Sequence, residues 1–181
     1  GGPVYSTKAN RFGFQQIQNQ YIYNAFEGQI DTGNMMDGLL QLALSKGIKI
    51  LNGVRVTRFE AQTDHVEVAT DAFTLQTHQL LIATNGFASQ FGLKEVQPAR
   101  AQVLITKPIP DLHIEGTFHL DKGYYYFRNI NNRILFGGGR NLDFKAEETT
   151  ELGQTPIVQN ELERLLKEVI LADTPLEIDR R

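Results

Sequence analysis

The chain has no cysteine, and its 181 residues include only four histidines. Without cysteine there is no disulfide framework, no thiolate metal site and no cysteine nucleophile. A cysteine-free sequence fits a reducing compartment, so we expect a cytoplasmic location. The histidines show no paired metal-ligand spacing, and we interpret them as surface or structural residues: His65, His78, His113 and His119.

Long apolar runs and dense basic segments are also absent. No run approaches the roughly 18 apolar residues of a membrane span, and no charged-then-apolar start indicates a signal peptide. The formal net charge is -3 without a Lys/Arg block, which argues against a nucleic acid or an anionic membrane as partner. With 41% hydrophobic and 22% charged residues, the composition is that of a globular protein with one domain or two small ones.

The first third of the sequence mixes strand and helix signals. Gln20–Phe26 alternates in part between polar and apolar residues, which is typical of a strand. Asp31 stands where a helix cap is expected, and apolar residues at helical spacing predict a helix over Met35–Leu44 that ends at Gly47. Ile48–Leu51 follows directly as a predicted strand, and this order is typical of half a crossover unit that feeds a parallel sheet.

Shorter extended runs come next. Val54–Phe59, Val66–Ala69 and Phe73–Leu75 are separated by polar turns and predict a small β-meander. The apolar run Leu80–Ala83 is typical of a buried strand, and it ends in Thr84-Asn85-Gly86. Small residues in this turn would let the backbone approach a flat cofactor or a diphosphate; the alternative is a strand that simply ends in a turn.

Beyond Gln97-Pro98 the strand signals are longer and predict a second, mainly antiparallel sheet. A hairpin turn is expected at Asn129–Asn132, because asparagine tolerates left-handed backbone. A cap and a proline at Thr155-Pro156 begin a predicted helix with an apolar stripe from Ile157 to Val169, and Leu176–Arg181 indicates a further strand. The predicted strands of the sheet are Ala99–Thr106, Gly116–Leu120, Gly123–Arg128 and Arg133–Gly137.

Four consecutive aromatic residues and an arginine form the motif Tyr124–Arg128. Alternation along a strand puts Tyr124, Tyr126 and Arg128 on one face. That face would offer an aromatic wall and a donor for a carboxylate. The alternative is cross-strand aromatic packing with Arg128 at the surface.

The glycine run Gly137–Gly139 permits a bulge or a close backbone approach. A phosphate-binding loop is excluded, because neither the lysine-serine ending of a P-loop nor the strand-glycine-helix context of a dinucleotide fingerprint is present. The carboxylate pairs Glu147/Glu148 and Glu161/Glu163 stand in polar surroundings and are interpreted as solvated faces.

In this order, the pieces resemble the D-amino-acid-oxidase-like (DAO) family of FAD-dependent oxidoreductases, which includes glycine oxidase, sarcosine oxidase and γ-glutamylputrescine oxidoreductase. The resemblance covers Gly28–Arg181 and depends on the order rather than on any single string. In the family's Pro-x-Arg-Gly-Gln motif, this chain has Ala101 in place of glycine. The strings that carry the resemblance are Gly28–Asp31, Gly47–Ile50, Val54–Phe59, Leu81–Phe87, Pro98–Val103, Tyr124–Arg128 and Arg133–Arg140.

The resemblance implies roles for individual residues. It assigns Val56 to the adenine site of FAD and Ala83, Thr84 and Asn85 to contacts with the cofactor. It places Tyr124, Tyr126 and Arg128 in the substrate-binding wall. No catalytic residue and no metal ligand follows from it.

The family's opening strand and Gly-x-Gly-x-x-Gly turn, where a helix N-terminus binds the flavin diphosphate, are missing from this sequence. We therefore expect an internal fragment with an α/β (α+β) fold. Residues 1–26 would lead into the substrate domain, and 27–96 would form part of a Rossmann-like FAD-binding domain with a β-meander. Residues 97–175 would form a mainly antiparallel substrate-binding domain flanked by a helix, and 176–181 would return to the FAD domain.

The reaction implied is oxidation of the C–N bond of an amino acid or amine by hydride transfer to flavin. Because the diphosphate site is missing, we expect the chain alone to be inactive and to lack FAD. The expected partners are a small amine or amino-acid substrate and a second copy of the chain, bound through an uncovered apolar face. The alternative function is a non-catalytic ligand-binding or interaction module.

Overall fold

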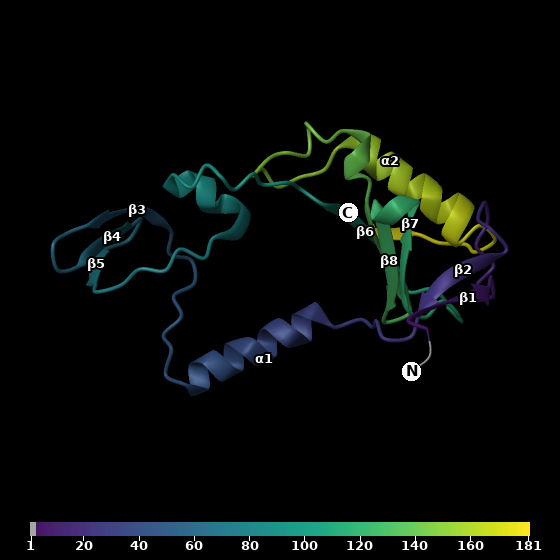
Figure 1. Cartoon of the computed structure of the whole chain (residues 1–181), viewed down its shortest axis with the longest axis horizontal. Helices are drawn as coiled ribbons and strands as arrows, with labels where there is room; N and C mark the ends of the chain where they lie inside the picture. The colour runs from purple at the N-terminus through teal and green to yellow at the C-terminus, as the bar shows by residue number, and fades with distance from the viewer. Residues whose placement is uncertain (1–2) are drawn as a thin grey trace. The chain divides into compact units, whose positions relative to one another are not determined.

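The computed structural model describes residues 3–181, which fall into two compact units. One unit contains the residues up to 29 together with 98–181, and the other contains residues 30–97. Both combine helices with antiparallel strands, which confirms the expected α/β (α+β) class (Figure 1). The main elements of the first unit are β1 (Tyr5–Ala9), β2 (Gln20–Asn24), β6 (Gln102–Thr106), β7 (Thr117–Leu120), β8 (Tyr125–Ile130), β9 (Arg133–Gly138), α2 (Pro156–Leu165) and β10 (Ile178–Arg180). Those of the second are α1 (Thr32–Ser45), β3 (Val56–Ala61), β4 (Val66–Thr70) and β5 (Thr74–Thr77).

Five strands of the first unit form one sheet in the order β10-β6-β9-β8-β7. All four neighbouring pairs run antiparallel, as the sequence predicts. The predicted hairpin between β8 and β9 is confirmed, although β8 continues to Ile130. The turn consists of Asn131 and Asn132, whose φ angles of 49° and 57° lie in the left-handed region that asparagine tolerates.

One face of this sheet carries the core of the unit, and α2 lies across it (Figure 1). Strand alternation buries Tyr125 and Phe127 of β8 and Phe136 of β9 on this face. Phe14, from the loop between β1 and β2, packs edge-on against Phe127 with ring centroids 5.5 Å apart. Burial of each such side chain contributes roughly 1.5–3 kcal/mol, so these aromatic residues hold the loop and the sheet together.

The predicted second helix is confirmed, and it changes geometry near its end. Pro156 opens α2 where a missing N–H is tolerated, and Val158 and Leu162 are fully buried against the sheet. Ile157, expected in the apolar stripe, is 52% exposed. The helix continues as a π-helical turn, Leu166–Ile170, in which the N–H of Leu171 donates to the carbonyl of Leu166 at 2.8 Å.

Glu147 is buried, with 1% of its side chain exposed, so its interpretation as part of a solvated face is wrong. Arg100 donates to it twice, from Nε to Oε2 at 2.9 Å and from Nη2 to Oε1 at 3.0 Å. Gln102 Nε2 donates to Oε1 at 2.8 Å, and the Thr155 hydroxyl donates to the same oxygen at 3.2 Å. The sequence indicates Thr155 as the cap of α2. Thr155 does stand at the N-cap position, but its hydroxyl makes no capping hydrogen bond.

Further hydrogen bonds extend this buried network into α2. Gln102 Oε1 accepts from the backbone N–H of Thr155 at 3.0 Å and from Gln159 Nε2 at 3.1 Å. The network thus joins the start of β6, the segment before α2 and the first turn of the helix. Ala101, which replaces the glycine usual in the family motif, is exposed beside this network, so its methyl group needs no space in the core.

The second unit contains the predicted meander, β3-β4-β5, with antiparallel pairing throughout. The predicted first helix is also confirmed: α1 begins after Asp31, whose carboxylate accepts from the N–H of Asn34 at 3.0 Å. No residue of α1 is buried. Within residues 3–181, no helix is long and apolar enough to cross a membrane.

Two strands predicted in this unit are not formed. Ile48–Leu51 has no strand structure, and Ile48 and Leu51 are 54% and 62% exposed. Leu80–Ala83 is not a strand either, and Leu81 is 88% exposed. Both runs are apolar enough for a buried strand, but neither has a strand partner within the described residues, and an extended segment needs a partner for its backbone groups.

The Glu147 network predicts a pH-dependent stability. Hydrogen bonds from Arg100, above all, and from Gln102 and Thr155 lower the pKa of the Glu147 carboxyl below its ordinary value of 4.5, against the opposing effect of burial. A depressed pKa stabilises the fold above the unfolded-state pKa, and the stabilisation is lost as pH falls through the folded-state value. We expect Glu147→Gln to lower the free energy of unfolding by roughly 2–4 kcal/mol at neutral pH and by less in acid, measured by urea denaturation across a pH series.

Glu177→Gln is the matched control, because Glu177 pairs with Lys107 at the surface, where water screens the interaction. This variant should change the unfolding free energy far less than Glu147→Gln at neutral pH. Equal effects of the two substitutions at every pH would contradict a stabilising role for the buried carboxylate.

Candidate functional site

The sheet face opposite α2 carries most of the residues that the sequence assigns to a substrate wall. Tyr126 and Arg128 lie half-buried on this face, because their strand neighbours Tyr125 and Phe127 point into the core. Tyr124 lies immediately before β8 and is 41% exposed. The structure therefore brings Tyr126 and Arg128 onto one face of β8, with Tyr124 at the point where the strand begins.

The ring of Tyr126 lies over Gly137. These two residues are directly paired across β8 and β9, and Gly137 is also paired with Val103 of β6. A Cβ atom at Gly137 would stand 2.9 Å from the Tyr126 ring and 2.7 Å from Val103. Glycine at this position thus leaves room for the Tyr126 ring, and burial raises the pKa of the Tyr126 hydroxyl.

Gly138 confirms the close backbone approach expected from the glycine run. Its φ of +122° is unfavourable for any residue with a Cβ atom, and such an atom would lie 2.1 Å from the carbonyl oxygen of Tyr124. The next residue, Gly139, donates its N–H to that same carbonyl at 3.0 Å. The end of β9 is therefore fixed against Tyr124, and the chain leaves the sheet beside the predicted substrate wall.

The register adds residues that sequence reasoning did not single out. His119 of β7 is directly opposite Tyr126, and Thr117 is directly opposite Arg128, so both belong to the same face. Leu135 of β9 is paired with Arg128 from the other side. The strand pairing is what places these three residues beside Tyr126 and Arg128.

The residues assigned to the cofactor lie in the second unit. Val56 begins β3, and Ala83 and Thr84 lead into the 3-10 helix Asn85–Phe91. Phe91, at the end of that helix, packs against Phe59 of β3 with ring centroids 5.9 Å apart. The helix and the meander that carry these residues are therefore in contact.

Thr84 has a property that suits a ligand contact. Its hydroxyl oxygen is buried and has no hydrogen-bond partner among the described residues. A buried hydroxyl without a partner is costly, and it is free to bond with a polar group of a bound molecule. The neighbouring Asn85 has a φ of 47°, so the backbone turns sharply next to this hydroxyl.

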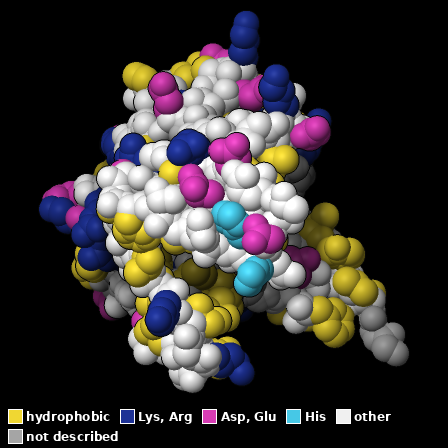
Figure 2. Space-filling view, turned by 90° about the vertical axis from the view of Figure 1, so that its left-hand side faces the viewer, with side chains coloured by type: hydrophobic (Ala, Val, Ile, Leu, Met, Phe, Trp, Pro, Cys, Tyr) yellow, Lys and Arg dark blue, Asp and Glu magenta, His cyan; other side chains and the backbone are white. Residues whose placement is uncertain are grey.

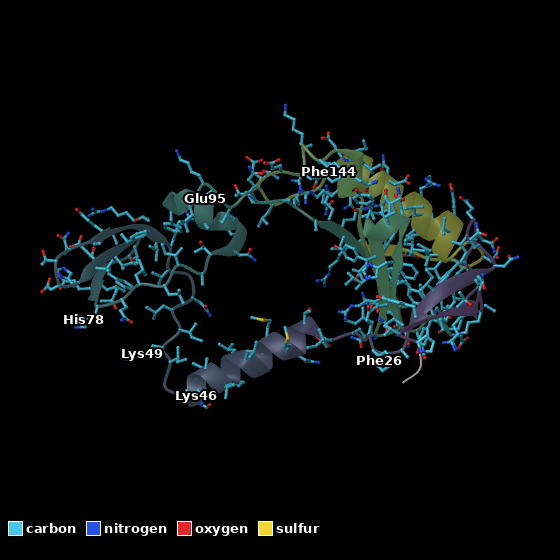
Figure 3. All side chains as sticks on the ribbon, viewed as in Figure 1. Phe26, Lys46, Lys49, His78, Glu95 and Phe144 are labelled. Atoms are coloured by element: carbon cyan, nitrogen blue, oxygen red, sulfur yellow. The ribbon has the colours of Figure 1, made fainter. Side chains whose placement is uncertain are left out.

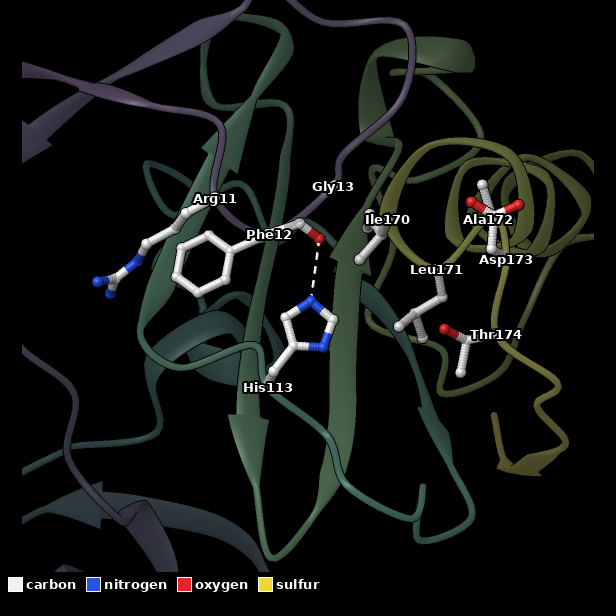
Figure 4. A pocket seen from close by; sticks show the side chains of 9 residues that line it. All are labelled: Arg11, Phe12, Gly13, His113, Ile170, Leu171, Ala172, Asp173 and Thr174. Carbon is white, nitrogen blue, oxygen red and sulfur yellow. Dashed lines mark hydrogen bonds between the residues drawn. The ribbon is translucent and has the colours of Figure 1, made fainter.

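A hollow of about 250 Å³ lies elsewhere in the first unit, lined in part by Phe12, His113 and Asp173. His113 Nε2 is 3.2 Å from the carbonyl oxygen of Phe12, while the guanidinium of Arg11 is turned away from the hollow (Figure 4). None of the predicted site residues lines it. The hollow therefore does not correspond to the predicted substrate wall.

The charged side chains of the described residues do not cluster into a metal site. Within residues 3–181 there is no group of three or more His, Asp and Glu side chains that could hold a metal ion. On the face shown in Figure 2, acidic and basic side chains are intermingled and hydrophobic side chains reach the surface between them. This mixed pattern differs from the continuous basic surface of nucleic-acid-binding proteins.

Comparison with known proteins identifies the family. The model of the family described as DAO, FAD dependent oxidoreductase, matches residues 9–180. No curated protein matches the chain significantly. The match includes the sheet of the first unit and the whole of the second unit. The chain therefore belongs to the DAO family of FAD-dependent oxidoreductases.

Proposed function

We propose that this chain supplies the substrate sheet and part of the flavin-binding region of an enzyme that oxidises the C–N bond of an amino acid or a small amine. The family match carries the oxidoreductase assignment. The C–N specificity is supported by the sheet face of β8, where the hydroxyl-bearing ring of Tyr126 and the guanidinium-bearing Arg128 stand two residues apart. We assign residues 97–175 to substrate binding and 27–96 to the cofactor. A cytoplasmic location stays a prediction from the lack of cysteine.

On the substrate side, Tyr126 and Arg128 would bind and orient rather than react. A tyrosine hydroxyl keeps its proton at neutral pH, and burial raises the pKa of Tyr126 further, so this group can donate a hydrogen bond. A guanidinium binds a carboxylate through two parallel hydrogen bonds, which suits Arg128 to an amino-acid substrate. Tyr124 would contact the same ligand from the start of the strand.

On the cofactor side, Val56, Ala83, Thr84 and Asn85 would hold FAD. The unpartnered Thr84 hydroxyl is the observation that supports this assignment. When bound, FAD supplies the hydride acceptor of the reaction. The side chains of this chain would fix the cofactor and exclude water from it.

Replacing Arg128 tests the substrate side. In a FAD-loaded enzyme that contains this chain together with a diphosphate-binding segment, we expect Arg128→Gln to reduce kcat/KM for amino acids by roughly tenfold to a hundredfold, because a charge-assisted hydrogen bond to the carboxylate is lost. Amines without a carboxylate should be affected far less. The measurement is steady-state oxidation and anaerobic flavin bleaching with matched amino-acid and amine substrates.

Arg180→Gln serves as the control. Arg180 is exposed on β10, so this substitution removes the same charge at a position away from the proposed site. Flavin that is bleached by no amine or amino acid would overturn the C–N assignment and favour the non-catalytic binding module.

The 181-residue chain alone should bind FAD weakly or not at all. It has no Gly-x-Gly-x-x-Gly turn to hold the diphosphate, and the Thr84 segment would contact only other parts of the cofactor. Titration of the purified chain followed by flavin fluorescence quenching measures this. Purified protein with stoichiometric flavin absorbance would contradict the expectation.

The chain should also self-associate through α1. This helix exposes apolar side chains on several sides, including Met36, Leu39 and Leu42 at 59%, 52% and 52%. A helix that is apolar around most of its circumference is normally covered. We expect light scattering to give a mass that rises with concentration, and Leu39→Glu with Leu42→Glu to abolish the rise.

Ile157→Glu, which changes an equally exposed apolar residue on α2, is the control for this test and should leave the rise in mass unchanged. A clean monomer at every concentration would contradict self-association.

A further inference from the structure

Three side chains meet where β9 leaves the sheet: Tyr124, Arg140 and Phe144. The family resemblance assigns a ligand contact to Tyr124 but not to Arg140 or Phe144. The rings of Tyr124 and Phe144 lie edge to face, with centroids 6.0 Å apart. The guanidinium of Arg140 lies over the ring of Phe144, with its carbon 5.5 Å from the centroid. Phe144 stands on the segment between β9 and α2 and is 48% exposed (Figure 3).

Arg140 has no acidic partner in this arrangement. Its side chain is exposed, and within residues 3–181 it forms no ion pair. The nearest acid along the chain, Asp143, uses its carboxylate to accept from the N–H of Ala146 at 3.0 Å. The guanidinium is therefore held by stacking on Phe144, and its N–H donors are available to an anion.

The backbone around these side chains is fixed at both ends. Gly139 donates to the carbonyl of Tyr124 at 3.0 Å, which anchors the segment where it leaves β9. Glu147, three residues after Phe144, is held by Arg100 and Gln102 in the buried network. Between these anchors, the N–H of Glu147 donates to the carbonyl of Asp143 at 3.1 Å. Phe144 is thus presented on a short, doubly anchored turn.

A preorganised pair of exposed aromatic rings beside a guanidinium has the chemistry of a ligand site. Aromatic rings offer a large contact area with little loss of conformational entropy, and a rigid turn lowers the cost of binding further. Arginine selects carboxylates by two parallel hydrogen bonds. We propose that Tyr124, Phe144 and Arg140 bind a small molecule in which a carboxylate is attached to a flat or apolar group.

The carboxylate can belong to the amine substrate or to a separate carboxylic acid. If Tyr124 contacts substrate, the ligand is a distal part of the amine substrate, and this assignment rests on the proposed function. A free carboxylic acid that acts as an effector has the same chemistry. Binding itself is measured without flavin or turnover, so its failure is distinct from a failure of the proposed function.

The binding test uses phenylacetate and its neutral isostere phenylacetamide, titrated into the ¹⁵N-labelled chain and followed by NMR. We expect phenylacetate to shift the signals of residues 124, 140 and 144, and Arg140→Gln to weaken its binding by roughly tenfold or more. Phe144→Leu should weaken the binding of both phenylacetate and phenylacetamide, because the stacking surface is lost. Unchanged amide signals elsewhere establish that each variant is folded.

Lys145→Gln is the matched control, because it removes a positive charge from the same turn without a ring contact, and it should leave phenylacetate binding unchanged. The proposal is overturned if phenylacetate binds no better than phenylacetamide, if Arg140→Gln binds it normally, or if the shifts map to other residues. In a FAD-loaded enzyme that contains this chain together with a diphosphate-binding segment, competitive inhibition of amine oxidation by phenylacetate identifies the substrate site, and non-competitive inhibition identifies an effector site.

Discussion

The burial of one carboxylate organises the first unit. Glu147 is removed from water almost completely, so it is compatible with the fold only while Arg100, Gln102 and Thr155 surround it. These partners come from the start of β6 and the start of α2, and the carboxylate therefore fixes both elements relative to each other. The Arg and Gln of the family's Pro-x-Arg-Gly-Gln motif thus act here as a structural clamp. The residues proposed to bind substrate, Tyr126 and Arg128, lie on the other face of the sheet.

The two faces of β8 show how the clamp and the candidate site are divided. Tyr125 and Phe127 belong to the core that α2 covers, and Tyr126 and Arg128 face the opposite way. The glycines of β9 complete this division, since Gly137 makes space for the Tyr126 ring and Gly138 lets the chain turn against Tyr124. A sheet whose two faces are used separately can vary its ligand residues without disturbing the core.

Local patterns predicted most elements of the fold, and long-range contacts account for what they missed. The alternation of Tyr124–Arg128 and the paired asparagines of the hairpin depend on neighbours in sequence, and the structure follows them. Leu80–Ala83 shows the limit, because an apolar run becomes a strand only when another strand pairs with it. Glu147 is a second case, since its partner Arg100 is 47 residues away and nothing beside it in sequence indicates burial. His119 entered the candidate face only through the register of β7 and β8. The roles of Tyr126, Arg128 and Thr84 as ligand contacts stay predictions.

The π-helical turn that ends α2 affects how this sequence should be compared with its relatives. Leu171 bonds to the carbonyl five residues earlier, so the turn contains one residue more than an α-helical turn would. Val169 and Ile170, both in this turn, are buried in the core of the unit. A relative with a regular helix here would be one residue shorter, and an alignment gap placed outside 166–170 would misalign by one the positions between that gap and the turn.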